Sequence, residues 1–140
     1  IERQSSNNPW TQTQLLESIK NPVNLAYSLI YKSEIIGYLI AMPVIESADI
    51  LNIAIDSSYQ RKGFGKALIK HLIQALNKRG ISEVLLEVRQ SNVSVIKFYL
   101  AQGFKEISIR KNYYTKNSNE PSVKEDGIIM RLEISTTKNT

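Results

Sequence analysis

The spacing of apolar residues changes along the chain and separates predicted helices from predicted strands. The strongest helical pattern spans residues 63–79, where the core-facing stripe consists of Phe64, Ala67, Leu68, His71, Leu72, Ala75 and Leu76. We interpret His71 in this stripe as structural. Lys78 and Arg79 near the negative end of the helix, with Gly80 after it, are typical of a helix C-terminus. Shorter helices are predicted before Asn21-Pro22 and over residues 92–102.

Short runs of β-branched and aromatic residues predict six strands. They lie at residues 25–31, 35–42, 49–55, 83–88, 104–113 and 127–134. The polar segment 115–125 predicts a loop between the last two. Helices follow the third and fourth strands, and such crossovers imply local parallel pairing. The pattern therefore predicts one α/β domain with a mixed sheet over residues 1–134, followed by a frayed tail at 135–140.

Composition removes several classes of site. The chain has 140 residues, 42% of them hydrophobic, which suits one domain with a buried core. It has no cysteine and one histidine, so a disulfide framework, a thiolate zinc site, a cysteine nucleophile and a multi-histidine metal site are excluded. The lack of cysteine is consistent with a cytoplasmic protein. No apolar run approaches the roughly 18 residues of a membrane span.

The charge balance indicates an anionic partner. Lys and Arg number 18 against 13 Asp and Glu, which gives a formal net charge of +5, and the sequence pI is about 9.4. Nucleic acid and a phosphate-rich small molecule both fit this charge. The total charge does not distinguish between them.

One segment suggests where an anion binds. Gln60-Arg61-Lys62-Gly63-Phe64-Gly65-Lys66-Ala67 lies between a predicted strand and the strongest predicted helix. A helix N-terminus offers unpaired N–H groups and partial positive charge, and glycines let the backbone approach a phosphate. The spacing matches neither a Walker loop nor the G-x-G-x-x-G fingerprint. On its own, the segment is equally consistent with a tight turn carrying a solvated basic face.

A family resemblance adds to this picture. Gln60-Arg61-Lys62-Gly63-Phe64-Gly65 matches the Q/R-x-x-G-x-G/A signature of the GCN5-related N-acetyltransferases (GNAT). Further matching segments occur in the family's order: Asn8-Pro9-Trp10, Leu86-Glu87-Val88-Arg89, Ser91-Asn92, Phe98-Tyr99, Gly103-Phe104 and Arg110-Lys111-Asn112-Tyr113-Tyr114. Over residues 1 to about 134, the set resembles the bacterial RimI type, which acetylates ribosomal proteins at alanine.

The resemblance implies a twisted mixed sheet with helices on both faces. Two parallel strands, here 49–55 and 83–88, splay apart and admit acetyl-CoA. The implied cofactor-binding residues are Ile53, Ala54, Ile55, Gln60, Arg61, Lys62, Gly63, Phe64, Gly65, Lys66, Ala67, Asn92 and Tyr99. RimI-type chains usually begin with a further strand and the first part of a helix. The match lacks both, so we expect an N-terminally truncated domain with one unpaired sheet edge.

The resemblance also assigns chemical roles. An α-ammonium has a pKa of roughly 8 and must lose a proton before it attacks. Glu87 is the candidate base, because an acidic residue among apolar neighbours takes up protons more readily; the alternatives are an exposed strand residue or a partner of Arg89. Tyr99 is the candidate acid for the departing sulfur, and core packing is its alternative. The implied substrate-binding residues are Trp10, Asn52, Tyr113 and Tyr114.

The sequence therefore predicts a cytoplasmic, acetyl-CoA-dependent enzyme that acetylates the N-terminal amine of a ribosomal protein, with alanine the expected first residue. We expect direct transfer, no metal, no membrane partner and no direct nucleic-acid readout. The alternatives are a related GNAT enzyme for another protein terminus or a small amine, and a nonenzymatic CoA-binding or RNA-binding module. The sequence shows no RNA-binding signature and no aromatic stacking platform.

Overall fold

The computed structural model describes residues 12–117 and 119–134. The predictions for Trp10 and for the tail at 135–140 lie outside the described residues. The helices are α2 (Gln12–Lys20), α3 (Phe64–Lys78) and α4 (Val93–Ala101), with a 3₁₀ turn, η1, at Ser57–Tyr59. The strands are β1 (Leu25–Tyr31), β2 (Glu34–Val44), β3 (Ser47–Ile55), β4 (Glu83–Arg89), β5 (Lys105–Asn117) and β6 (Glu120–Glu133).

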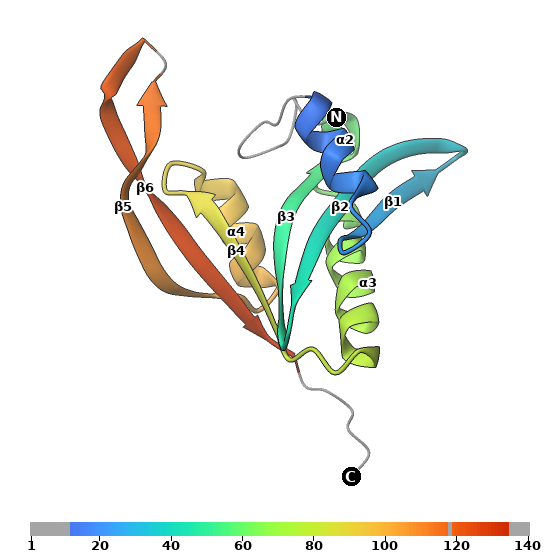
Figure 1. Cartoon of the computed structure of the whole chain (residues 1–140). Helices are drawn as coiled ribbons and strands as arrows, with labels where there is room; N and C mark the ends of the chain where they lie inside the picture. The colour runs from blue at the N-terminus through green and yellow to red at the C-terminus, as the bar shows by residue number, and fades with distance from the viewer. Residues whose placement is uncertain (1–11, 118, 135–140) are drawn as a thin grey trace.

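The strands form one mixed sheet in the order β1-β2-β3-β4-β6-β5. All neighbouring pairs are antiparallel except β3 and β4, as the crossover through α3 predicts. The parallel pairing predicted for the crossover through α4 is wrong, because β6 lies between β4 and β5. Helices α2 and α3 lie on opposite sides of β2 and β3 (Figure 1). The described architecture thus confirms the predicted α/β class with helices on both faces.

The parallel pair is short, and this opens the sheet. Residues 47–49 of β3 pair with residues 83–85 of β4. Beyond that point the two strands diverge, as Figure 1 shows from their shared lower end upward. On β3, Ile40 of β2 faces Asn52 while Ala41 faces Ile50, so Leu51 is the extra residue of a β-bulge. A bulge bends and twists its strand, and this one lies where β3 separates from β4.

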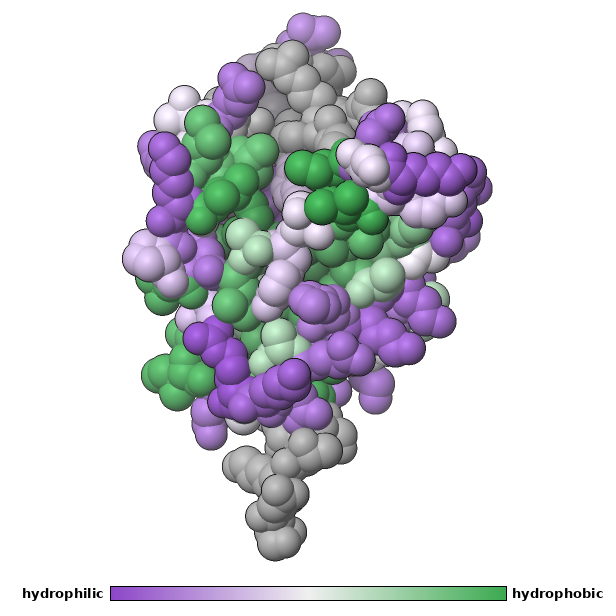
Figure 2. Space-filling model, turned by 90° about the vertical axis from the view of Figure 1, so that its right-hand side faces the viewer, coloured by the Kyte–Doolittle hydropathy of each residue, from purple (hydrophilic) through white to green (hydrophobic). Residues whose placement is uncertain are grey.

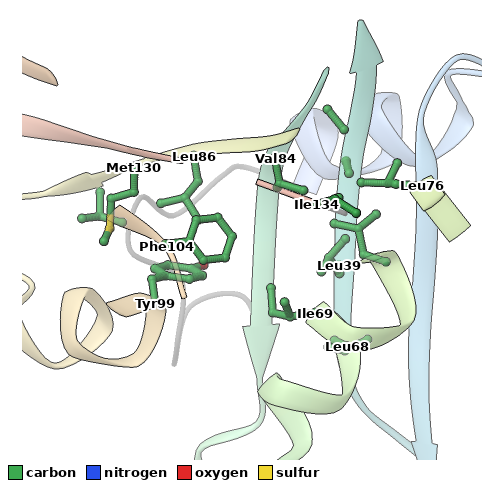
Figure 3. Close-up of a cluster of buried hydrophobic side chains, with 14 of the residues drawn as sticks. Leu39, Leu68, Ile69, Leu76, Val84, Leu86, Tyr99, Phe104, Met130 and Ile134 are labelled. Atoms are coloured by element: carbon green, nitrogen blue, oxygen red, sulfur yellow. The ribbon is translucent and has the colours of Figure 1, made fainter. Parts of the chain in front are cut away.

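Buried side chains of α3 and α4 hold the two halves of the opened sheet together. Alternate residues of β4, Val84, Leu86 and Val88, are buried. Figure 3 shows Leu86 above the rings of Tyr99 and Phe104, while Leu68 and Ile69 of α3 lie below Leu39. One continuous cluster includes all of these residues. Burial of this apolar surface is the main stabilising contribution.

The buried stripe of α3 differs from the predicted one. Leu68, Ile69, Leu72 and Leu76 are buried, whereas Ala67 and His71 are exposed. The sheet therefore meets the helix about one position further along than the sequence pattern predicts. The His71 ring makes an edge contact with Tyr27 at 4.6 Å between centroids, which suits the structural role predicted for it.

The segment predicted as a polar loop, 115–125, is instead largely strand. Strands β5 and β6 continue as a long hairpin and pair as far as Asn117 with Glu120. This hairpin projects beyond the rest of the sheet (Figure 1). Its side chains are mostly exposed and polar, so the sequence lacks the apolar alternation that reveals half-buried strands.

At the other end of the sheet, β1 forms the edge of the described structure. Figure 2, a view from the β1 side of the molecule, shows hydrophobic residues interspersed with hydrophilic ones. Ile30 and Ile35, at the β1–β2 turn, are exposed. Among the described residues, no helix combines the length and apolar character needed to cross a bilayer.

Candidate active site

A cavity of about 840 Å³ occupies the opening between β3 and β4. Its walls come from both diverging strands, the start of α3, helix α4 and the β5 hairpin. The lining residues are Ile50, Leu51, Asn52, Ile53, Ala54, Ile55, Gln60, Arg61, Gly63, Gly65, Lys66, Leu86, Glu87, Val88, Asn92, Ser94, Val95, Phe98, Tyr99, Gln102 and Tyr114. A volume of this order is typical of small-molecule and cofactor sites.

The loop before α3 presents backbone amides at one end of the cavity. Gly63 has φ +87° and no side chain caps the helix there. The first helical hydrogen bond runs from the Ala67 N–H to the Gly63 carbonyl at 3.0 Å. The preceding amides of the first turn have no helical acceptor, and Arg61 and Lys66 add positive charge at this end. The end can therefore bind an anion such as a pyrophosphate.

Two contacts fix the position of this loop. The Gln60 Nε2 donates to the Ile55 carbonyl at 2.9 Å, which joins the loop to the end of β3. A Cβ added to Gly65 would lie 3.1 Å from the Phe98 ring of α4. The lack of a side chain at Gly65 therefore allows α3 and α4 to approach across the cavity.

Three residues of the predicted cofactor set do not line the cavity: Lys62, Phe64 and Ala67. Lys62 and Ala67 are exposed. Phe64 instead packs with Tyr31, at 5.1 Å between ring centroids, and with Tyr59, at 6.0 Å. Phe64 therefore connects the start of α3 to β1. The sequence did not reveal this orientation, because the side chain of a helix's first residue can point to either side of the loop.

Glu87 lies on the cavity wall in the part of β4 that has separated from β3. Its side chain is 18% exposed, and its Oε1 accepts a hydrogen bond from Nη2 of Arg110 at 2.8 Å. Its Oε2 is buried and accepts no hydrogen bond from any described residue. The ion-pair partner is thus on the β5 strand, and the alternative partner considered from sequence, Arg89, binds elsewhere.

Tyr99 lies on α4 and reaches the same cavity. It is 4% exposed, and its ring contacts Phe98 and Phe104 at centroid distances of 5.2 and 5.3 Å. Burial raises the pKa of its phenol well above the usual value of 10.0. The hydroxyl is protonated at neutral pH, as a phenol is at its ordinary pKa, and its burial makes it a weaker acid than a free phenol. Tyr99 is at once a core residue and a cavity residue.

The predicted substrate-binding residues fall into three groups. Asn52 and Tyr114 line the cavity. Tyr113 does not, and its exposed ring meets that of Tyr114 edge-on at 4.9 Å. The pKa of Tyr114 is raised to about 12; burial is the largest cause, and the nearby negative charge of Glu87 is the next. Trp10 lies outside the described residues.

A buried carboxylate, Glu125, connects elements that form the wall of the cavity. Glu125 on β6 is 8% exposed. Its Oε1 accepts the Ser91 N–H at 2.8 Å, and its Oε2 lies 3.1 Å from the Ser91 hydroxyl and 3.5 Å from Arg89 Nη1. Burial alone would raise the pKa of Glu125, but the Ser91 hydrogen bonds and the Arg89 charge outweigh it and lower the pKa. Arg89 also stacks over Tyr114 at 4.5 Å.

Several lining residues were not predicted as site residues. Ser94 and Gln102 are polar cavity residues near the two ends of α4. Neither belongs to a motif, and both are ordinary for a helix of this composition, so no sequence signal identified them. Phe98 belongs to the Phe98-Tyr99 segment that carries the family resemblance, but no site role was predicted for it. Among the described residues, no cluster of three or more His, Cys, Asp or Glu side chains is arranged to hold a metal ion.

The sequence model of the Acetyltransferase (GNAT) family matches residues 1–104. The chain belongs to the GNAT family. It is also 38% identical over 135 residues to the [ribosomal protein bS18]-alanine N-acetyltransferase of Escherichia coli strain K12, covering 96% of this chain and 88% of that one.

Solved GNAT structures agree with the fold. The crystal structure of the ribosomal-protein-S18-alanine N-acetyltransferase from Escherichia coli matches with a TM-score of 0.86 and 36% identity, covering 100% of this chain and 87% of that chain. A putative streptothricin acetyltransferase from Bacillus anthracis, solved in complex with acetyl coenzyme A, matches with a TM-score of 0.75 and 26% identity, covering 84% and 66% of the two chains. This GNAT chain is therefore an acetyltransferase by family and by fold.

Proposed function

We propose that this GNAT enzyme transfers an acetyl group from acetyl-CoA to the N-terminal α-amine of a ribosomal protein that begins with alanine. The observation that carries the proposal is a single cavity that joins an anion-binding helix terminus to a carboxylate and a buried phenol. The relative from Escherichia coli, named for alanine acetylation of ribosomal protein bS18, supports the acceptor class. The reaction is expected in the cytoplasm.

The residues at the α3 end fit the pyrophosphate of acetyl-CoA. Gly63 and Gly65 leave the helix amides accessible, and Arg61 and Lys66 supply positive charge. The diverging part of β3, from Ile53 to Ile55, would bind the pantetheine arm through its backbone, as an added strand does. Asn92 and Tyr99 would lie toward the sulfur end. Acetyl-CoA supplies the activated acetyl group, and the protein binds, orients and exchanges protons with it.

Glu87 would take the proton from the incoming ammonium, directly or through one water molecule. Its side chain is 18% exposed, so a proton can reach it from the cavity. Its position on the cavity wall suits a general base. The freed amine would then attack the acetyl carbonyl. No covalent enzyme intermediate is expected, since the chain lacks cysteine.

Tyr99 would give its proton to the sulfur as CoA leaves. A phenol is protonated at neutral pH, so the proton is present when the sulfur leaves. A backbone N–H near Ile53, next to the bulged part of β3, would stabilise the negative charge that develops on the acetyl oxygen. The proposed reaction uses a carboxylate, a phenol and backbone amides, and requires no metal ion.

The acceptor class can be tested with matched peptides. A peptide that begins with alanine and contains an internal lysine would be incubated with enzyme and acetyl-CoA, beside the same peptide with a blocked α-amine. Mass spectrometry should locate one acetyl group on the free α-amine and none on the blocked peptide. Acetylation of a small amine with no turnover of the alanine peptide would support the alternative GNAT substrate and contradict this proposal.

A nonenzymatic module is distinguished by calorimetry. An acetyl-CoA-binding enzyme should give saturable heat on titration with acetyl-CoA. A protein that binds only RNA should give none. Saturable binding without turnover of any amine would leave a CoA-binding module as the function.

A further inference from the structure

The two oxygens of the Glu87 carboxylate have different surroundings. Oε1 accepts the Arg110 hydrogen bond at 2.8 Å, while Oε2 accepts none from the described residues. Oε2 is buried against the backbone of Gly127, where an added Cβ would overlap it, and lies close to the Tyr114 ring. Arg110 therefore fixes one oxygen, and Gly127 and Tyr114 enclose the other, so the carboxylate is held in one orientation.

The Arg110 guanidinium is itself held in place. Its Cζ lies 3.8 Å from the centre of the Tyr113 ring, and Tyr113 meets Tyr114 edge-on. A guanidinium that stacks on an aromatic ring and hydrogen-bonds a carboxylate is restricted in direction as well as in position. Arg110 therefore has one geometry in which both contacts are made.

The backbone of β5 produces this arrangement. The pairing of β5 with β6 shifts between Arg110, which faces Gly127, and Tyr114, which faces Glu125. Within the shifted segment, Asn112 has φ +50°, and its N–H donates to Asp126 Oδ1 at 2.9 Å. The bulge brings the Tyr113 ring back over Arg110, which a regular strand would not do because neighbouring side chains alternate.

We propose that Arg110 is a positioning residue for the catalytic carboxylate: it binds Oε1 of Glu87 and holds the group in one orientation at the cavity wall, where it takes up the acceptor's proton. This inference rests on the proposed role of Glu87 as general base. The Arg110 side chain is 48% exposed, so its ion pair adds little to stability. Its loss should therefore appear in the reaction rate rather than in folding.

The test compares Arg110→Gln and Arg110→Lys in the full chain, with the alanine peptide as acceptor. Arg110→Gln should lower kcat roughly tenfold, the scale of one hydrogen bond to a charged group, with KM for acetyl-CoA within about twofold of the wild-type value. Arg110→Lys should recover part of kcat because it keeps the charge. Lys111→Gln is the matched control: it removes the same charge from the next, exposed residue and should leave kcat unchanged.

A double-mutant cycle separates this inference from the proposed function. In the Glu87→Gln background, Arg110→Gln should cause no further loss, because the carboxylate that it positions is gone. Wild-type kcat in Arg110→Gln, or the same loss in both backgrounds, would overturn the role of Arg110 and leave Glu87 as the base. Wild-type kcat in Glu87→Gln would overturn both. Melting curves of each variant establish that the proteins compared are folded.

Discussion

The backbone N–H of Ser91 donates a 2.8 Å hydrogen bond to Oε1 of Glu125, which joins the turn before α4 to the β5–β6 hairpin. The same carboxylate lies within 3.5 Å of Arg89 Nη1, and Arg89 stacks over Tyr114. Helix α4 carries Tyr99, and the hairpin carries Arg110. Glu125 therefore links the two elements that place the candidate proton donor and the residue that contacts Glu87.

Replacement of Glu125 by glutamine should destabilise the fold. The variant keeps the shape of the side chain but loses the charge, so the contacts with Ser91 and Arg89 weaken. We expect a loss of about 1–2 kcal/mol in the free energy of unfolding, measured by urea denaturation. Glu120→Gln on the exposed part of the same strand is the control and should change stability little. Equal stability of the two variants would contradict the role assigned to Glu125.

The same carboxylate predicts a dependence of stability on pH. The pKa of Glu125 is lowered in the folded protein from its usual value of 4.5, so in acid the unfolded chain binds the extra proton first. Its contribution is therefore complete above that usual value and is lost as pH falls through the lowered one. Urea denaturation from about pH 6 to about pH 3 should show the wild type and Glu125→Gln converging in acid. A constant difference over this range would be inconsistent with the shift.

Tyr99→Phe tests the proposed proton donor. The variant keeps the buried ring and its contacts with Phe98 and Phe104, and removes only the hydroxyl. We expect kcat to fall roughly tenfold or more, with the acetyl-CoA dissociation constant from calorimetry nearly unchanged. An unchanged kcat would assign Tyr99 to core packing alone.

Two glycines with similar backbone geometry form a matched pair for the anion site. Gly63 and Gly80 have φ +87° and +74°, and a Cβ at either would meet no atom within 4 Å. Alanine should therefore cost about 1–2 kcal/mol of stability at both positions, through backbone strain alone. Only Gly63→Ala should also weaken acetyl-CoA binding, because Gly80 follows the far end of α3. Equal affinities in the two variants would contradict the placement of the pyrophosphate at Gly63.

The fold was predictable where burial leaves a periodic trace. Strand β1 has the predicted bounds, and the alternation of Val84, Leu86 and Val88 in β4 matches their burial. The extension of β5 and β6 through residues 115–125 was not predictable, because an exposed hairpin carries polar residues on both faces. The buried position of Glu125 follows from that hairpin and was missed with it.

The site was predictable where the chemistry depends on local sequence. Gly63 and Gly65 identified the loop in the sequence. The turn requires a positive φ at Gly63, and the approach of Phe98 requires a residue without a side chain at Gly65. The ion-pair partner of Glu87 was not predictable from the sequence. Arg110 is 23 residues away, and the bulge in β5 determines which arginine reaches the carboxylate. Tyr114 and Asn52 were identified through the family resemblance.

The most direct test of the account is the pH dependence of acetyl transfer by the wild type and Glu87→Gln, measured as release of CoA with the alanine peptide. Wild-type kcat should fall on the acidic side of the profile. Glu87→Gln should lower kcat by roughly a hundredfold or more and flatten that acidic limb, because the variant has no carboxylate to take up the proton. A variant with wild-type kcat and the same acidic limb would contradict Glu87 as the general base.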